Sequence, residues 1–125
     1  MVRRHLDQQR GHAFRATEED VVLASFDSPA RAVACATRIR DDAGRLGVAV
    51  GAGIHTGEVA IRQEEMSGRT VDVAARAQAL ATPQQLLISR TVVDLISGSG
   101  TVTVDRGEHS LDGVPGSWRL FSIES

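Results

Sequence analysis

The order of extended and helical segments constrains the fold of this chain more than any other feature. Apolar residues recur at helical spacing over residues 28–47 and 70–81, and a shorter helical segment covers 89–96. Short apolar runs bounded by turn residues predict strands at 12–17, 21–26, 48–55, 58–62, 85–88, 101–104 and 117–123. The predicted order, β-β-α-β-β-α-β-α-β-β, is typical of an α+β fold whose helices cover a sheet largely on one face.

Local signals indicate where several of these segments begin and turn. Ser28 followed by Pro29 predicts a helix start, because the serine oxygen accepts from free N–H groups and proline at the first position loses no bond. Ser89 predicts the cap of the short helix. Thr56 and Gly57 predict the turn of a hairpin between 48–55 and 58–62, with a polar loop after it over 63–68.

Composition bounds the class of protein. A chain of 125 residues that is 42% hydrophobic predicts one domain, spanning residues 1–125, with one core. The 14 basic residues, all arginine, and the 16 acidic ones are interspersed, which argues against a nucleic-acid surface or an acidic-lipid anchor. No apolar run reaches the roughly 20 residues of a membrane span, and a single cysteine fits a reducing compartment. We therefore expect a cytoplasmic domain without a nucleic-acid or membrane partner.

An acidic cluster lies at the predicted tip between the first two strands. It consists of Glu18, Glu19 and Asp20. Carboxylate oxygens are the ligands that Mg²⁺ and Mn²⁺ prefer. A solvated acidic turn is the alternative interpretation, and the cluster alone leaves both open.

Two further places carry side chains suited to catalysis or ligand binding. Asp72 and Arg76 stand one turn apart on a predicted helix, where Arg76 can stabilise charge on phosphate oxygens. The alternative is an ordinary ion pair between them, worth about 0.2–0.5 kcal/mol. His55 lies beside the predicted turn at Gly57, with no second histidine or cysteine at metal-ligand spacing, so we interpret it as a hydrogen-bonded structural residue.

Several strings, collinear over nearly the whole chain, resemble those of bacterial class III adenylate/guanylate cyclase domains. They are residues 26–32 (FDSPARA), 53–58 (GIHTGE), 73–76 (VAAR), 89–92 (SRTV), and 105–108 (DRGE) with 113–118 (GVPGSW). The resemblance implies the ferredoxin-like core of that family, with a mainly antiparallel sheet and helices packed on it.

The resemblance also implies an activity and a set of site residues. The family converts a nucleoside triphosphate, ATP or GTP, to the 3′,5′-cyclic nucleotide and pyrophosphate, at sites formed between two head-to-tail domains. Two metal ions, Mg²⁺ or Mn²⁺, are held by two aspartates. Alignment without gaps places the second aspartate on Asp20, and a one-residue gap would place it on Glu19. The arginine that stabilises the transition state falls on Arg76, and the family's asparagine one turn earlier falls on Asp72.

This chain departs from the family at several of these positions. The strand with the first metal aspartate is missing, so we expect an N-terminally truncated version of the fold. Glu19 and Val21 replace the glycines of the family's Gly-Asp-Gly turn. The lysine that reads adenine falls on Ala16, and its acidic or hydroxyl partner falls on Glu65. The carboxylate of Asp72 replaces a neutral amide and would repel substrate phosphates unless Arg76 pairs with it.

Three functions remain open at this point. The first is a cyclase that works as a homodimer. The second is a non-catalytic dimerising or nucleotide-sensing regulatory module, and the third is an interaction domain without a nucleotide site. The departures favour weak or absent catalysis. The sheet edge left unpaired by the missing strand predicts a tight or strand-exchanged homodimer.

Overall fold

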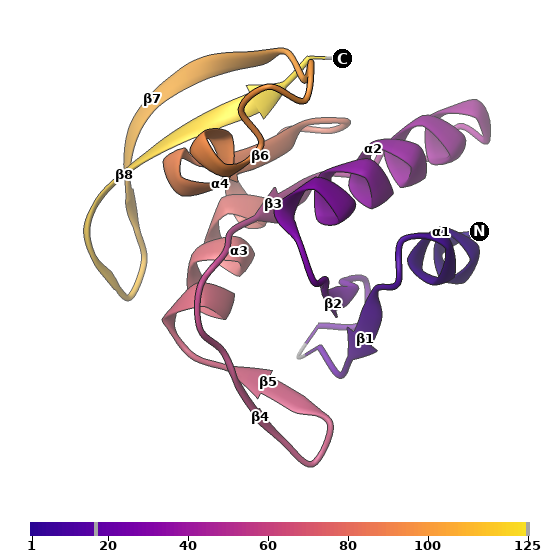
Figure 1. The fold of residues 1–125 in the computed structure, drawn as a ribbon, viewed down its shortest axis with the longest axis horizontal. Coiled ribbons are helices and arrows are strands. Elements are labelled where there is room, and N and C mark those ends of the chain that lie inside the picture. Colours follow the sequence, from indigo (N-terminus) through magenta and orange to yellow (C-terminus); the bar gives the residue numbers. More distant parts are fainter. Residues whose placement is uncertain (17, 125) are drawn as a thin grey trace.

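A computed structural model describes residues 1–16 and 18–124 (Figure 1). Within them the helices and strands follow the order that the sequence predicts, with one short helix added before it and one short strand added before the helix at 69–80. The helices are α1 (Val2–Gln8), α2 (Pro29–Arg45), α3 (Arg69–Leu80) and α4 (Arg90–Leu95). The strands are β1 (His12–Phe14), β2 (Leu23–Ser25), β3 (Ala52–Ile54), β4 (Ala60–Arg62), β5 (Glu65–Ser67), β6 (Leu86–Ser89), β7 (Thr103–Leu111) and β8 (Val114–Ile123).

The described strands form one larger sheet and two hairpins. The four-stranded sheet has the order β3-β6-β8-β7, in which β3 and β6 are parallel and the other neighbours are antiparallel. The strands β1 and β2 pair only with each other, and so do β4 and β5. The fold is therefore α+β and mainly antiparallel, which confirms the predicted fold class.

Two of the predicted turns are in different places. The hairpin predicted between 48–55 and 58–62 is wrong, because β3 pairs in parallel with the distant β6. The strand β4 instead pairs with β5 around Gln63 and Glu64, inside the segment predicted as a loop. Both turn residues have positive φ, 51° and 67°, as a two-residue hairpin turn requires. Neither is glycine or asparagine, so the sequence carried no signal for this turn.

Helix starts follow the predicted caps. The Ser28 side chain accepts a hydrogen bond from the Arg31 N–H at 3.3 Å, and Pro29 occupies the first turn of α2. The Ser89 side chain accepts from the Val92 N–H at 3.4 Å at the start of α4. Both predictions are confirmed, because a cap depends only on residues within one turn.

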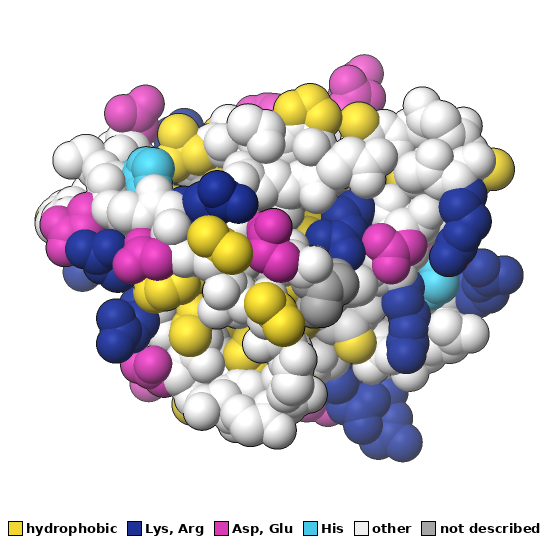
Figure 2. Space-filling model, turned by 90° about the horizontal axis from the view of Figure 1, so that it is seen from above, with side chains coloured by type: hydrophobic (Ala, Val, Ile, Leu, Met, Phe, Trp, Pro, Cys, Tyr) yellow, Lys and Arg dark blue, Asp and Glu magenta, His cyan; other side chains and the backbone are white. Residues whose placement is uncertain are grey.

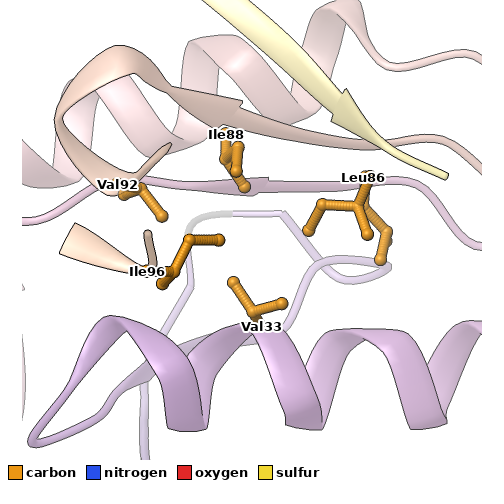
Figure 3. Close-up of a cluster of buried hydrophobic side chains, with 6 residues drawn as sticks. Val33, Leu86, Ile88, Val92 and Ile96 are labelled. Atoms are coloured by element: carbon orange, nitrogen blue, oxygen red, sulfur yellow. The ribbon is translucent and has the colours of Figure 1, made fainter. Parts of the chain in front are cut away.

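Helices cover both faces of the four-stranded sheet. On one face, side chains of α2 and α4 enclose a core with those of β6 and β8, as Figure 3 shows: Val33, Leu86, Ile88, Val92, Ile96 and Ile123. On the other face, α3 packs through Val73 and Ala77 against smaller clusters. The expectation of helices largely on one face was therefore wrong. The strand β6 is buried throughout. Its residues do not alternate between apolar and polar, so this pattern could not show which faces of the sheet the helices cover.

The strand β3 and α3 approach each other unusually closely. A Cβ atom added to Gly53 would lie 2.3 Å from the Ala74 carbonyl oxygen and 2.4 Å from the Gln78 nitrogen. Only glycine fits there, which confirms the close backbone approach expected at this position. This contact fixes the height of α3 above the sheet.

The helix α1 packs against α2, and β1 and β2 pair only with each other rather than joining the four-stranded sheet (Figure 1). In the described part of the chain, the outer edges of both β2 and β3 have no strand partner. No helix among the described residues is long and apolar enough to cross a membrane.

Candidate functional site

The acidic tip lies where the sequence places it. Glu19 and Asp20 occupy the turn between β1 and β2, and both are exposed. Neither takes part in an ion pair with any other described residue, and Thr17 of the same loop lies outside the described residues. The two carboxylates are thus free to accept hydrogen bonds or cations from solvent.

A complete metal centre is not present in this arrangement. Within residues 1–16 and 18–124, no three His, Cys, Asp or Glu side chains gather closely enough to hold a metal ion. Two adjacent, exposed carboxylates supply too few ligands for a tight Mg²⁺ or Mn²⁺ site. The donor set of one chain therefore does not fit the two-metal site that the resemblance implies.

Asp72 and Arg76 are presented by a well-anchored helix. Both side chains are exposed on α3, Asp72 in its first turn and Arg76 one turn later. Val73 and Ala77, at 0% and 1% exposure, hold the opposite side of the helix against the sheet. The structure contains no ion pair between Asp72 and Arg76, so that interpretation is wrong. The Arg76 guanidinium is available to a ligand.

The two positions aligned with base recognition lie on separate hairpins. Ala16 is half-buried just after β1, and Glu65 is the exposed first residue of β5, paired with Arg62. Among the described residues, no strand of one hairpin pairs with a strand of the other. The structure does not bring these residues into a shared pocket within one chain.

His55 forms a compact polar cluster at the end of β3. Its Nδ1 lies 2.6 Å from the Ser89 hydroxyl oxygen, and its ring meets Trp118 edge-on at 5.4 Å between centroids. Burial lowers the pKa of the imidazole from its ordinary value. The interpretation of His55 as a hydrogen-bonded residue is confirmed, although the sequence did not identify its partners.

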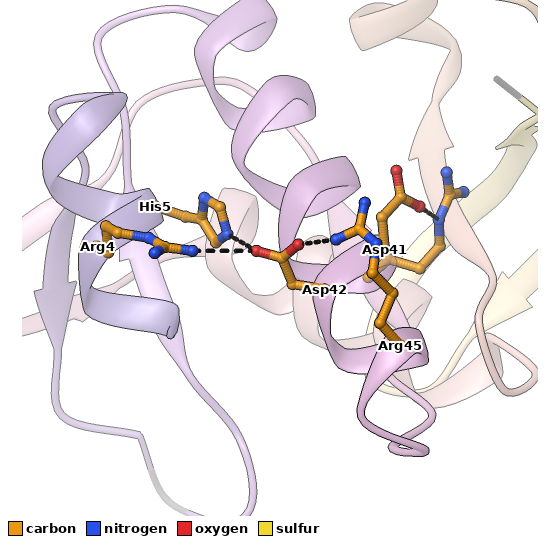
Figure 4. Close-up of polar contacts among 6 residues, drawn as sticks. Arg4, His5, Asp41, Asp42 and Arg45 are labelled. Carbon is orange, nitrogen blue, oxygen red and sulfur yellow. Dashed lines mark hydrogen bonds and ion pairs between the residues drawn. The ribbon is translucent and has the colours of Figure 1, made fainter.

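A second cluster joins α1 to α2 and was not found from the sequence. Figure 4 shows Arg4, His5 and Arg45 directed at the carboxylate of Asp42. The His5 Nε2 lies 2.5 Å from an Asp42 oxygen, and this bond is the largest cause holding the pKa of the Asp42 carboxyl below its usual value. His5 is only 5% exposed, and its Nδ1 has no partner among the described residues. No sequence signal links residues so far apart.

Comparison with known proteins establishes the family. Residues 31–125 match the model of the adenylate and guanylate cyclase catalytic domain. An uncharacterised protein of Mycobacterium tuberculosis is 34% identical over 101 residues, which cover 78% of this chain and 35% of that protein. The putative adenylate cyclase 3 of Rhizobium meliloti is 29% identical over 114 residues, covering 84% of this chain and 19% of that protein. The chain therefore belongs to the adenylate and guanylate cyclase catalytic domain family, and it spans about a third or less of these relatives' length.

Solved structures confirm the fold. The adenylate/guanylate cyclase/hydrolase from Silicibacter pomeroyi superimposes with a TM-score of 0.86 at 20% identity, over 100% of this chain and 77% of that chain. An adenylate cyclase from Trypanosoma brucei, solved in its monomeric state, gives 0.79 at 18% identity, over 98% and 74%. A dimeric guanylyl cyclase domain from Blastocladiella emersonii gives 0.71 at 15% identity, over 98% and 76%.

Proposed function

We propose that residues 1–125 act as one cyclase homology domain that binds a nucleoside triphosphate, ATP or GTP, and converts it only weakly to the cyclic nucleotide. The observation that carries this proposal is the exposed Arg76, without an ion-pair partner among the described residues, on a helix anchored by the core. A guanidinium held in this way binds phosphate oxygens in a bidentate manner and stabilises charge that develops on them.

Two features argue that turnover is slow. The exposed carboxylate of Asp72 shares the solvent-facing side of α3 with Arg76 and repels a polyanionic substrate. Glu19 and Asp20 stand on a hairpin whose described strands, β1 and β2, are not paired with the sheet that carries α3. Cations that neutralise the triphosphate are thus held weakly and are not fixed relative to Arg76.

We also propose that the working unit is a homodimer, tight or strand-exchanged. The hairpin of β4 and β5 projects from the body in Figure 1, and Val59 and Ile61 are 37% and 60% exposed on it. Other exposed apolar side chains lie between charged ones on the face in Figure 2. Apolar projections and unpaired strand edges such as those of β2 and β3 favour association with a second chain.

A second candidate function is a non-catalytic, nucleotide-sensing regulatory module. The observation that favours it is the incomplete ligand set at Glu19 and Asp20. Such a module would keep nucleotide binding at Arg76 and the dimer interface, and it would form no cyclic product.

The test is cyclic-nucleotide formation from ATP and from GTP with Mn²⁺, using wild type, Arg76→Ala and Arg69→Ala. Arg69 is the matched control, because it is also exposed on α3. We expect product that falls about 100-fold or more in Arg76→Ala and is unchanged in Arg69→Ala. Binding in calorimetry without product would favour the regulatory module. Absence of binding to either triphosphate would refute both functions, and a concentration-independent monomer in sedimentation would refute the dimer.

A further inference from the structure

His55 lies where four elements of the fold meet. It directly follows β3, and it bonds Ser89 at the junction of β6 and α4. Its ring stacks edge-on against Trp118 of β8 at an interplanar angle of 85°. Trp118 in turn packs against the cluster of Val73, Leu111 and Val114, in which Val73 belongs to α3. A continuous set of contacts therefore runs from the imidazole to the helix that carries Arg76.

Ser89 links this imidazole to the start of α4. Its buried hydroxyl oxygen accepts the Val92 N–H and shares a second hydrogen bond with the Nδ1 of His55. The neutral ring lets the Ser89 hydroxyl either donate or accept this bond. Protonation of the ring places a proton on Nδ1, so the hydroxyl can then only accept it.

The backbone that follows His55 makes a second connection to α3. Gly57 lies against the first turn of the helix, where an added Cβ would be 2.5 Å from the Thr70 hydroxyl oxygen. Thr70 donates a hydrogen bond to the Glu58 carbonyl at 2.8 Å. Thr70 precedes Asp72 by two residues, so any shift of the segment after β3 is transmitted to the start of α3.

We propose that His55 is a positioning residue for Arg76: through Ser89 and Trp118, its imidazole fixes where α3 presents the guanidinium to the nucleotide. The proposal deepens the proposed function and rests on it. In this proposal His55 acts through α3 and does not itself contact the nucleotide. A displacement of α3 by about 1 Å would be enough to lower the rate, since catalysis depends steeply on the geometry of the charged group.

Protonation of His55 is expected to disturb its contacts with Ser89 and Trp118. Burial alone depresses its pKa below the ordinary value of 6.5, and no charged partner contributes to the shift. The ionisable residues on the elements around it are Glu58 after β3; Arg69, Asp72 and Arg76 on α3; Arg90 and Asp94 on α4; Arg119 on β8; and Asp105, Arg106, Glu108 and His109 on β7. Arg119 is paired with Asp105 and Glu108, and Arg90 with Asp94. His109 is the cross-strand partner of Trp118 and so requires its own control.

The first test compares two variants of His55 in the full chain by product formation across pH. His55→Phe keeps a ring against Trp118 and removes the hydrogen-bond partner of Ser89, whereas His55→Asn restores a polar partner without a titrating group. We expect kcat to fall about 10- to 100-fold in His55→Phe with little change in KM, and to recover largely in His55→Asn. The acid limb of the wild-type profile should disappear in His55→Asn. Full kcat in His55→Phe, or an unchanged acid limb in His55→Asn, would overturn the proposal.

The second test does not depend on turnover. Trp118 is the single tryptophan of the chain, so its fluorescence reports protonation of the neighbouring ring. We expect an acid transition centred below pH 6.5 that persists in His109→Asn and vanishes in His55→Asn. Amide exchange over α3 at neutral pH should be faster in His55→Phe than in wild type. If wild type makes no product but these signals appear, the proposed activity fails while the positioning of α3 stands. Identical fluorescence and exchange in all variants would refute the positioning role.

Discussion

The two regions that carry the candidate site residues are held in very different ways. Asp72 and Arg76 stand on α3, which buries Val73 and Ala77 against the four-stranded sheet. Glu19 and Asp20 stand at the tip of the β1–β2 hairpin, whose strands are at most half-buried and pair only with each other. The phosphate-binding half of the proposed site is thus built into the core, and the cation-binding half is not. Under the proposed function, this difference accounts for nucleotide binding combined with slow turnover.

The largest expected effect is a difference in stability between a substitution in the four-stranded sheet and one in the β1–β2 hairpin. Ile88, at 0% exposure in β6, contacts side chains of α2 and α4, so Ile88→Ala should lower the free energy of unfolding by about 2–5 kcal/mol. Leu23 is only half-buried in β2, and Leu23→Ala should cost about 1 kcal/mol or less. Urea denaturation of both variants checks this. Equal losses would show that the hairpin is held as firmly as the sheet.

A smaller effect is expected where α3 meets β3. Gly53→Ala places a methyl group against the backbone of α3 and should destabilise the chain by about 1–3 kcal/mol, with faster amide exchange over α3. Gly44→Ala is the matched control. Its methyl group meets only the end of the Gln84 side chain, and its place inside α2 favours alanine by up to about 1 kcal/mol. A Gly53→Ala variant as stable as wild type would contradict the close approach of α3.

The smallest effect concerns the attachment of α1 to α2. The bond from His5 holds the pKa of the Asp42 carboxyl below its ordinary value of 3.8, so Asp42 stabilises the fold above that pH. This contribution is lost as pH falls through the lowered pKa. We expect amide exchange in α1 to accelerate selectively in acid, and Asp42→Asn to show fast exchange already at neutral pH. Asp105→Asn removes a similarly depressed carboxyl from β7 and should leave exchange in α1 unchanged.

Features that depend on neighbours in the sequence were predicted correctly. The caps at Ser28 and Ser89 and the helical spacing of Val73 and Ala77 each involve residues within one or two turns. Gly53 also indicated the close approach of another backbone, because glycine inside a strand often marks such a place.

Features that depend on distant partners were not predicted. The parallel pairing of Ala52 with Leu86 cannot be inferred from the turn signal at Gly57, which is local. The bond between His5 and Asp42 joins two helices separated by a hairpin, and neither residue differs in type from many exposed ones. The same holds for the site. The sequence identified the residue types at Asp72 and Arg76, but only the structure shows that they do not pair and that α3 is held from the sheet side.

The strand order of the sheet also predicts the order in which its strands pair during folding. The strands β7 and β8 are adjacent in the sequence and pair through a tight turn, so they can associate early. The strand β3 must wait until α3 and β6 have been placed, since its partner in parallel pairing lies beyond a helix. Until this pairing forms, both edges of β3 are open to other strands. We therefore expect expression at low temperature to raise the soluble yield of this chain.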